Sequence, residues 1–512
     1  MSRASTAESL SDLCERLLPA QEPAREAGIA KRASEDIPGA RDRIGMLLDP
    51  ATFVEIGALV CKPGEPGALY GGGVVTGYGL VEGRPVAVYA HDQSVFCGSV
   101  GEAFGRKVAT ILKFAAKVGC PVVGITDSDG VRDAEPLSSL AWHAELVRRQ
   151  EPLSGYVPQV SMVFGRCVGS AVFAPINSDV LVATEDAYLS MTGLEVVSET
   201  NSLEELGGAW SQAEYGNIHH VAKDEKSAFE WVRQYLGYLP TNCRESAPIV
   251  NPGLEPQVTE TDLDLNVIVP DADSTGYDMR EILLRIFDDG AFHEIEEAAA
   301  RNLVTGFARV DGRSVGVVAN QPMVAAGTLD ARAADKAAHF VRLCDAFEIP
   351  LIFVVDTPGF LPGAGQEKIG VIKRGGRFIF AFVEATVPKV TVVVRKSYGG
   401  GYAVMGSKQL GADVNLAWPT ARIAVMGAES AVSLIGAQQL AAVPAPERAA
   451  VRQQMIDFYN ATMATPWVAA ERGYIDAVIE PSATRLELRR ALRLLRDKIV
   501  IRSPRKHYLL PL

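Results

Sequence analysis

Short apolar runs rich in β-branched residues alternate along the chain with longer amphipathic stretches. The runs occupy residues 85–90, 121–126 and 159–165, and then 314–319, 350–356 and 389–396. The stretches 101–118 and 330–348 have the apolar spacing of a helix. Strands that alternate with helices predict βαβ units and a mostly parallel sheet covered on both faces. We therefore predict an α/β fold whose ligands bind where strands end and helices begin.

The same pattern occurs twice in the chain. When the sequence is shifted by 229 residues, identities run through 76–130 and include Gly98/Gly327, Lys107/Lys336 and Asp127/Asp356. With one more residue inserted, Gly169 faces Gly399. The sequence therefore predicts two copies of one fold, each of about 230 residues.

Composition sets the expected boundaries of these copies. We predict a helical leader over 1–35, a first domain over 36–245 and a second domain over 274–512. The segment 246–273 is rich in proline and acidic residues, which is typical of a connection between domains.

The charge and cysteine content limit the class of protein. The 512 residues carry a formal net charge of −12, with 48% hydrophobic and 22% charged residues, which is typical of a globular protein and argues against a nucleic-acid partner. Seven scattered cysteines without a CxxC pair indicate a reducing compartment and no zinc ribbon. The N-terminus has no apolar signal region, and no stretch of about 18 apolar residues occurs. We therefore expect a cytoplasmic protein without a membrane span.

Glycine-rich segments follow corresponding strands in the two copies. They lie at 127–132 and 166–171 in the first copy, and at 356–367 and 395–408 in the second. Backbone N–H groups in such turns can converge on a developing oxyanion, although glycine also serves simple tight turns. Because two such turns recur at equivalent places, we favour a functional site. Asp127 and Asp356 could act as general bases, but a turn-capping role is the preferred interpretation.

Several common catalytic motifs are absent from the sequence. No GxxxxGK[ST] occurs, so ATP chemistry is not expected in this chain. GxSxG, HExxH and Cys/His ligand spacings are also missing, so neither a hydrolase elbow nor a metal site is indicated.

From about residue 40 onward, the chain resembles the carboxyltransferase (β) chain of biotin-dependent acyl-CoA carboxylases of the propionyl-CoA carboxylase type. The strings that carry the resemblance include VFCGSVGEAFGRK, PQVSMVFGRCVGSA, DTPGFLPGAGQE, RKSYGGGYAVMGSK and WPTARIAVMGAESAV.

The resemblance implies a duplicated crotonase-like (ClpP/crotonase) β-β-α superhelix and a homohexamer, with the site at a dimer interface. The first copy would bind an acyl-CoA and the second would bind carboxybiotin on a carrier protein. Carboxyl transfer to the α-carbon would pass through an enolate stabilised by backbone oxyanion holes. A separate biotin carboxylase chain would use the ATP, and the product would feed fatty acid or polyketide precursor metabolism.

Site residues follow from the same resemblance. The N–H groups of Gly169 and Ser170 would hold the thioester oxygen, and those of Gly400 and Gly401 the ureido oxygen. Further substrate contacts would be Gly98, Ser99, Gly101, Lys107, Asp129, Gly130, Ala171 and Ala403. The biotin side would include Asp356, Pro358, Gly359, Tyr398 and Gly399. No metal is expected.

Four departures from the usual family pattern bear on activity. Ser170 and Asp129 replace glycines, and Ser170 would be strained if its φ were positive. Ala403 replaces an aspartate near the acyl end, so a longer or bulkier acyl group is expected, and Gln212 stands where a histidine is usual. Two alternatives stay open: a biotin-dependent decarboxylase or transcarboxylase, and an inactive assembly subunit of a mixed complex.

Overall fold

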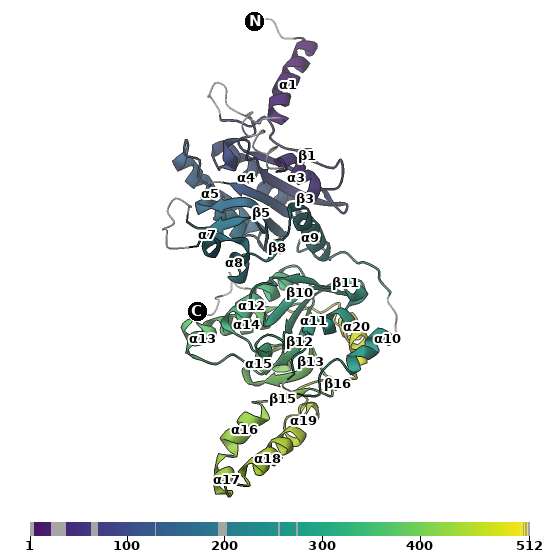
Figure 1. Cartoon of the computed structure of the whole chain (residues 1–512). Helices are drawn as coiled ribbons and strands as arrows, with labels where there is room; N and C mark the ends of the chain where they lie inside the picture. The colour runs from purple at the N-terminus through teal and green to yellow at the C-terminus, as the bar shows by residue number, and fades with distance from the viewer. Residues whose placement is uncertain are drawn as a thin grey trace. The chain divides into compact units, whose positions relative to one another are not determined.

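The computed structural model describes residues 5–21, 37–62, 70–128, 130–192, 202–253, 257–272, 275–504, 506 and 509. The chain forms two compact units, Met1–Ser246 and Ala247–Leu512. Each unit contains one eight-stranded mixed sheet with helices packed on it (Figure 1). The two matching sheets confirm the predicted duplicated α/β fold.

Unit 1 has the described strand order β1-β2-β3-β4-β5-β6-β8, with β7 paired to β5. Its strands are β1 (Val54–Glu55), β2 (Val74–Val81), β3 (Arg84–His91), β4 (Val122–Ser128), β5 (Gln159–Val168), β6 (Val180–Thr184), β7 (Tyr188–Ser190) and β8 (His220–Ala222). Its helices are α1 (Thr6–Gln21), α3 (Ala40–Leu47), α4 (Glu102–Val118), α5 (Pro136–Gln150), α6 (Phe173–Ile176), α7 (Leu203–Gly207), α8 (Ala209–Glu214) and α9 (Glu225–Tyr238).

Unit 2 repeats this order as β16-β14-β13-β12-β11-β10-β9, with β15 paired to β13. Its strands are β9 (His293–Ile295), β10 (Leu303–Val310), β11 (Arg313–Asn320), β12 (Leu351–Thr357), β13 (Lys389–Tyr398), β14 (Val414–Ala417), β15 (Arg422–Ala424) and β16 (Ala477–Val478). Its helices are α10 (Glu260–Leu263), α11 (Met279–Ile286), α12 (Ala331–Ala346), α13 (Ala364–Lys368), α14 (Val371–Glu384), α15 (Gly399–Val404), α16 (Ala428–Ile435), α17 (Ala437–Ala442), α18 (Arg448–Thr462), α19 (Pro466–Glu471) and α20 (Thr484–Leu494).

Both sheets contain the same irregularity just before the glycine-rich turns. In unit 1, Thr126 pairs with Val163, and the next recorded pair joins Ser128 to Cys167. In unit 2, Val355 pairs with Val393 and Thr357 with Ser397. The longer strand therefore has two extra residues, which bend it and re-aim the residues that follow. The turns after β5 and β13 thus leave their sheets in the same way.

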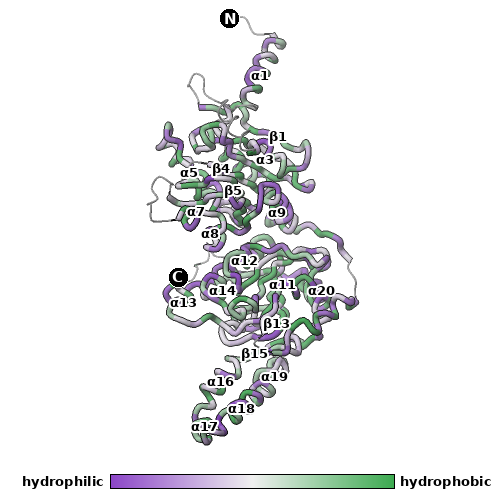
Figure 2. Tube along the Cα trace, in the orientation of Figure 1, coloured by the Kyte–Doolittle hydropathy of each residue, from purple (hydrophilic) through white to green (hydrophobic). Residues whose placement is uncertain are grey.

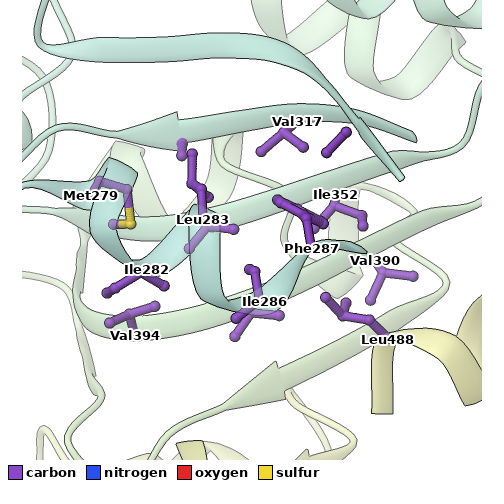
Figure 3. Close-up of a cluster of buried hydrophobic side chains, with 14 of the residues drawn as sticks. Met279, Ile282, Leu283, Ile286, Phe287, Val317, Ile352, Val390, Val394 and Leu488 are labelled. Atoms are coloured by element: carbon purple, nitrogen blue, oxygen red, sulfur yellow. The ribbon is translucent and has the colours of Figure 1, made fainter. Parts of the chain in front are cut away.

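The core of unit 2 shows why these residues fold as they do. Apolar residues of α11 recur at helical spacing, and they pack against the strands and α20 (Figure 3). The labelled side chains are Met279, Ile282, Leu283, Ile286, Phe287, Val317, Ile352, Val390, Val394 and Leu488. Burying one such side chain contributes about 1.5–3 kcal/mol, so the sheet is a firm base for its loops. Apolar residues follow the strands, whereas the outer helices mix apolar and polar residues (Figure 2).

Within the part of the chain that the structure describes, no helix combines the length and apolar character needed to cross a bilayer.

Candidate functional site

A left-handed turn follows β3 in unit 1, and the sequence analysis did not identify it. Phe96, Cys97 and Gly98 have successive φ values of 56°, 51° and 62°. A Cβ on Gly98 would lie 2.2 Å from the carbonyl oxygen of Asp127, so a side chain is excluded there. Each non-glycine residue in this conformation costs about 1–2 kcal/mol. Strain of this kind persists where the surrounding structure fixes it, and such places are often functional.

Unit 2 contains the same turn after β11. Ala325, Ala326 and Gly327 have φ values of 47°, 54° and 74°, and a Cβ on Gly327 would lie 2.4 Å from the carbonyl oxygen of Asp356. A polar side chain supports each turn from the preceding strand. His91 Nδ1 donates to the carbonyl of Gly98 at 2.8 Å, and Asn320 Nδ2 donates to the carbonyl of Gly327 at 3.3 Å.

Three loops of unit 1 meet at this turn. The N–H of Val100 donates to the carbonyl of Gly130 at 3.2 Å, which joins the turn to the end of β4. A Cβ on Gly130 would lie 2.9 Å from the carbonyl oxygen of Val168, so the end of β5 is also adjacent. The structure therefore brings together Gly98, Ser99, Gly101, Gly130, Gly169, Ser170 and Ala171. Asp129 lies outside the described residues.

The turn after β5 answers the question that the sequence raised about Ser170. The positive φ belongs to Gly169, at 61°, and Ser170 does not have one. The anticipated strain at the serine is therefore absent. A Cβ on Gly169 would meet no atom within 4 Å, so the turn faces open space there. The hydroxyl of Ser170 is buried and has no hydrogen-bond partner among the described residues.

The turn after β13 is packed more closely. Gly399 has a φ of 55°, equivalent to that of Gly169. A Cβ on Gly401 would lie 2.8 Å from Thr357 Cγ2 and 3.0 Å from Gly359 Cα, so the turn packs against the loop after β12. The first N–H groups of a helix have no acceptor within that helix. Those at the start of α15 can therefore serve a ligand oxygen, and the glycines there carry no side chains of their own.

The other residues that the resemblance assigns to the biotin side lie around this turn. Tyr398 is buried and caps α15, while Pro358 is half-buried in the loop that carries Gly359. Ala403 is the last residue but one of α15 and is half-buried.

The carboxylate of Asp356 lies beneath the site and is fully buried. It accepts hydrogen bonds from Tyr277 Oη at 2.8 Å, from Arg395 Nε at 2.9 Å and from the N–H of Lys396 at 3.0 Å. In unit 1, Asp127 accepts from Arg43 Nη1 at 3.0 Å. Each aspartate forms an ion pair with a buried arginine, which neither the general-base nor the turn-capping interpretation anticipated.

Lys107 was expected to contact CoA, but its ammonium is turned inward. Nζ donates to the carbonyls of Val74 at 2.5 Å and Gly71 at 3.3 Å, and burial lowers the pKa of Lys107 to about 8. Its counterpart Lys336 donates to three carbonyls in the same way. Both lysines therefore bind carbonyls of the segment that leads into the first long strand of their unit, β2 or β10. This shared role explains why a lysine occurs at both positions.

Arg132 is a site residue that the sequence analysis missed. Nη2 donates to the carbonyls of Ser99 at 2.6 Å and Gly72 at 2.9 Å, and the guanidinium lies 4.1 Å from the ring centroid of Phe96. Arg132 thus fastens the left-handed turn of unit 1. Its position could have identified it from the sequence, because Arg132 is the last residue of the glycine-containing segment 127–132 that follows a predicted strand.

Among the described residues, no group of three or more His, Cys, Asp or Glu side chains is arranged to hold a metal ion.

Comparisons with known proteins bear on the family and the fold of the chain. The model of the carboxyl transferase domain family matches residues 38–510. The chain is 58% identical to the biotin-dependent long chain acyl-coenzyme A carboxylase beta4 subunit of Mycobacterium tuberculosis, over 99% of this chain and 98% of that protein. It is 46% identical to the propionyl-CoA carboxylase beta chain of Saccharopolyspora erythraea, over 99% and 96%. The hexameric transcarboxylase 12S, solved with methylmalonyl-coenzyme A bound, superposes with a TM-score of 0.94 at 40% identity, over all of both chains.

Proposed function

Because this chain belongs to the carboxyl transferase family, as a β subunit of the biotin-dependent acyl-CoA carboxylase type, we propose that it moves a carboxyl group from carboxybiotin to the α-carbon of an acyl-CoA. The observation that carries the proposal is the duplicated turn. In both units a left-handed turn follows the third strand along the chain, β3 or β11. In both units a glycine with a positive φ, Gly169 or Gly399, directly follows the longest strand, β5 or β13.

Unit 1 supplies the acyl half-site in this proposal. The N–H groups of Gly169 and Ser170 hold the thioester oxygen and stabilise the enolate that forms when the α-proton leaves. One donor of this kind lowers the barrier by about 2.7–4 kcal/mol. The carboxylates of Asp127 and Asp356 are already bound to arginines, so this chain contributes positioning and electrostatic stabilisation instead of a carboxylate base.

Unit 2 supplies the half-site for the biotin group of a carrier protein. Gly400 and Gly401 carry no side chains of their own beside their N–H groups, which fits an oxygen acceptor such as a ureido carbonyl. When bound, carboxybiotin supplies the carboxyl group and a ureido nitrogen that can take the α-proton. ATP is used by a separate biotin carboxylase chain, and the active assembly is a homohexamer, as in the 12S relative.

The acyl group is proposed to be long. Ala403 leaves an uncharged, small position at the acyl end, and the relative with 58% identity is named for long-chain acyl-CoA. The Saccharopolyspora protein, which is named for propionyl-CoA, is less similar, at 46% sequence identity.

The test uses the full chain with free biotin as the carboxyl acceptor. Malonyl-CoA, methylmalonyl-CoA and α-carboxylated long-chain acyl-CoAs are offered in turn, and loss of the carboxyl group that depends on biotin is followed. Turnover is expected, with the highest kcat/KM for a long chain. If a folded hexamer shows no turnover with any of them, the proposal fails.

The 12S likeness also favours a second candidate, a transcarboxylase that runs the same half-reaction without ATP. Carboxylation of acyl-CoA that requires ATP, bicarbonate and a biotin carboxylase partner supports the first function. Carboxyl transfer between two organic substrates without ATP supports the second.

A further inference from the structure

One buried ion pair occurs in both units, but its arginine comes from different places. Asp127 is the penultimate residue of β4 and Asp356 that of β12, at equivalent positions of the repeat. In unit 2 the partner is Arg395 on the adjacent strand β13. The equivalent residue of β5 is Gly165, where a Cβ would lie 2.8 Å from Asp127 Oδ1. In unit 1 the guanidinium is supplied instead by Arg43 of α3.

The retained feature is therefore the charge pair and not a particular residue. A buried carboxylate is costly without a partner, and a hydrophobic pair of similar volume would often be no less stable. The two units place an arginine beside this aspartate from different elements, α3 in unit 1 and β13 in unit 2. Because both ion pairs lie next to the glycine-rich turns, we infer that they hold those turns in position. We propose that Arg43 and Arg395 are positioning residues, the first for the acyl half-site and the second for the biotin half-site. The assignment of half-sites rests on the proposed function.

In unit 1, Asp127 connects Arg43 to the left-handed turn. Its Oδ1 accepts from Gln93 Nε2 at 2.8 Å, in the segment that enters the turn. Its carbonyl oxygen is the atom against which Gly98 packs. A displacement of Asp127 would therefore disturb the turn both at Gln93, before the turn, and at Gly98, within it.

In unit 2, Asp356 makes corresponding connections. Oδ1 accepts from the N–H of Lys396 at 3.0 Å, three residues before Gly399. The N–H of Asp356 donates to Asn320 Oδ1 at 3.2 Å, and Asn320 supports the left-handed turn. Asp356 is thus linked to the left-handed turn through Asn320 and to the segment that leads into Gly399 through the N–H of Lys396.

Both arginines are themselves held in place. Arg43 is 3% exposed, and its other edge binds Glu225 of α9, with Nη2 2.6 Å from Oε1. It therefore joins α3, β4 and α9. Arg395 is also 3% exposed, donates through Nη1 to the carbonyl of Thr275 at 2.9 Å and lies 4.9 Å from the ring centroid of Tyr277. Such fixed guanidinium groups suit positioning, because displacement of a reacting group by about 1 Å can cost about 10²-fold in rate.

The experiment measures the two half-sites separately in the full chain. The variants are Arg43→Lys and Arg395→Lys, together with the charge-neutral combinations Arg43→Met/Asp127→Asn/Glu225→Gln and Arg395→Met/Asp356→Asn, which also neutralise the carboxylates that these arginines pair with. KM and kcat for α-carboxyacyl-CoA and for free biotin are determined, and acyl-CoA binding is measured by calorimetry. Arg41 lies on the same helix as Arg43 and forms a part-buried ion pair with Glu55 of β1, so Arg41→Met is the matched control for Arg43.

The Arg43 variants are expected to raise the acyl-CoA KM and dissociation constant at least about tenfold and to leave the biotin KM within about twofold, whereas the Arg395 variants do the reverse. Arg41→Met should change neither KM. Equal changes in both constants, or a loss of active protein with unchanged constants, would show a merely structural role and overturn the inference. If the wild type binds acyl-CoA but shows no turnover, the proposed function fails, and calorimetry of the Arg43 variants still decides the inference.

Discussion

Ser170 and Gly400 occupy the same place in the two units, one residue after the positive-φ glycine that follows β5 or β13. A Cβ on Gly400 would lie 3.2 Å from Phe360 Cδ2. The counterpart of Phe360 in unit 1 is Val131, because both form the isolated bridge to the segment after the left-handed turn. In unit 1 the small Val131 is found together with Ser170, whereas in unit 2 the large Phe360 is found together with Gly400. The two half-sites therefore differ in shape at the residue next to the oxyanion donors.

Replacing Ser170 by alanine should raise stability and leave catalysis nearly unchanged. The hydroxyl is buried and has no partner among the described residues, and a buried unsatisfied hydroxyl costs about 1–3 kcal/mol. The backbone N–H, which is the proposed donor, is kept. We expect the free energy of unfolding to rise by about 1 kcal/mol in urea titrations and kcat/KM to stay within about threefold.

The reciprocal variant Gly400→Ser should behave differently. Its side chain would press on Phe360, so biotin-dependent turnover is expected to fall at least about tenfold. A loss of more than tenfold in Ser170→Ala would instead show that the hydroxyl itself contacts the substrate.

The left-handed turns should not tolerate a methyl group. In Gly98→Ala and Gly327→Ala the new Cβ would overlap the carbonyl oxygen of Asp127 or Asp356, so backbone must move. We expect a loss of about 2–4 kcal/mol in stability and a fall in kcat/KM of at least about tenfold. Gly83→Ala is the matched control, because Gly83 also has a positive φ, of 74°, but open space around its Cβ. It should cost only about 1 kcal/mol and leave activity intact. Equal effects at Gly83 and Gly98 would show that conformational strain, and not overlap, decides the outcome.

The sequence predicted the duplicated α/β fold because strand runs and glycines recur in register. It located the strand-end segments, since Gly98/Gly327 and Gly169/Gly399 are visible as identities. It could not show the left-handed turns, because alanine, phenylalanine and cysteine rarely adopt that conformation and carry no signal for it. It also missed the pair of Arg43 with Asp127, because the partners are 84 residues apart and the repeat offers Gly165 where unit 2 has Arg395. The sequence also could not show that the ammonium of Lys107 binds backbone carbonyls, because an identity between repeats looks the same whether the residue serves a ligand or a carbonyl.

Lys107→Met should therefore reduce stability and not substrate affinity. The ammonium donates to the carbonyls of Gly71 and Val74, and the substitution removes both of these hydrogen bonds from a buried position. A loss of about 1–3 kcal/mol is expected, with the acyl-CoA KM of the folded protein unchanged. Thermal unfolding and steady-state kinetics check the two parts. A KM that rises tenfold with little loss of stability would restore Lys107 as a CoA contact.

His91 should make the stability of unit 1 depend on pH. Burial lowers the pKa of His91 from 6.5 to about 4, while its Nδ1 donates to the carbonyl of Gly98. Between these two values the unfolded chain binds more protons than the folded chain. The stability that neutral His91 provides is therefore fully present above pH 6.5 and is lost as the pH falls towards 4.

The variant His91→Asn tests this dependence, because Asn320 already fills the same position in unit 2 and donates to Gly327. The asparagine does not titrate, so the variant should lose less stability than the wild type between pH 6.5 and 4, by up to about 3 kcal/mol. Urea titrations at several pH values within that window measure the difference. Asn320→His should introduce a similar loss in unit 2. Parallel pH profiles for the wild type and His91→Asn would show that protonation of His91 does not limit stability, and that the turn tolerates a charged imidazole beneath Gly98.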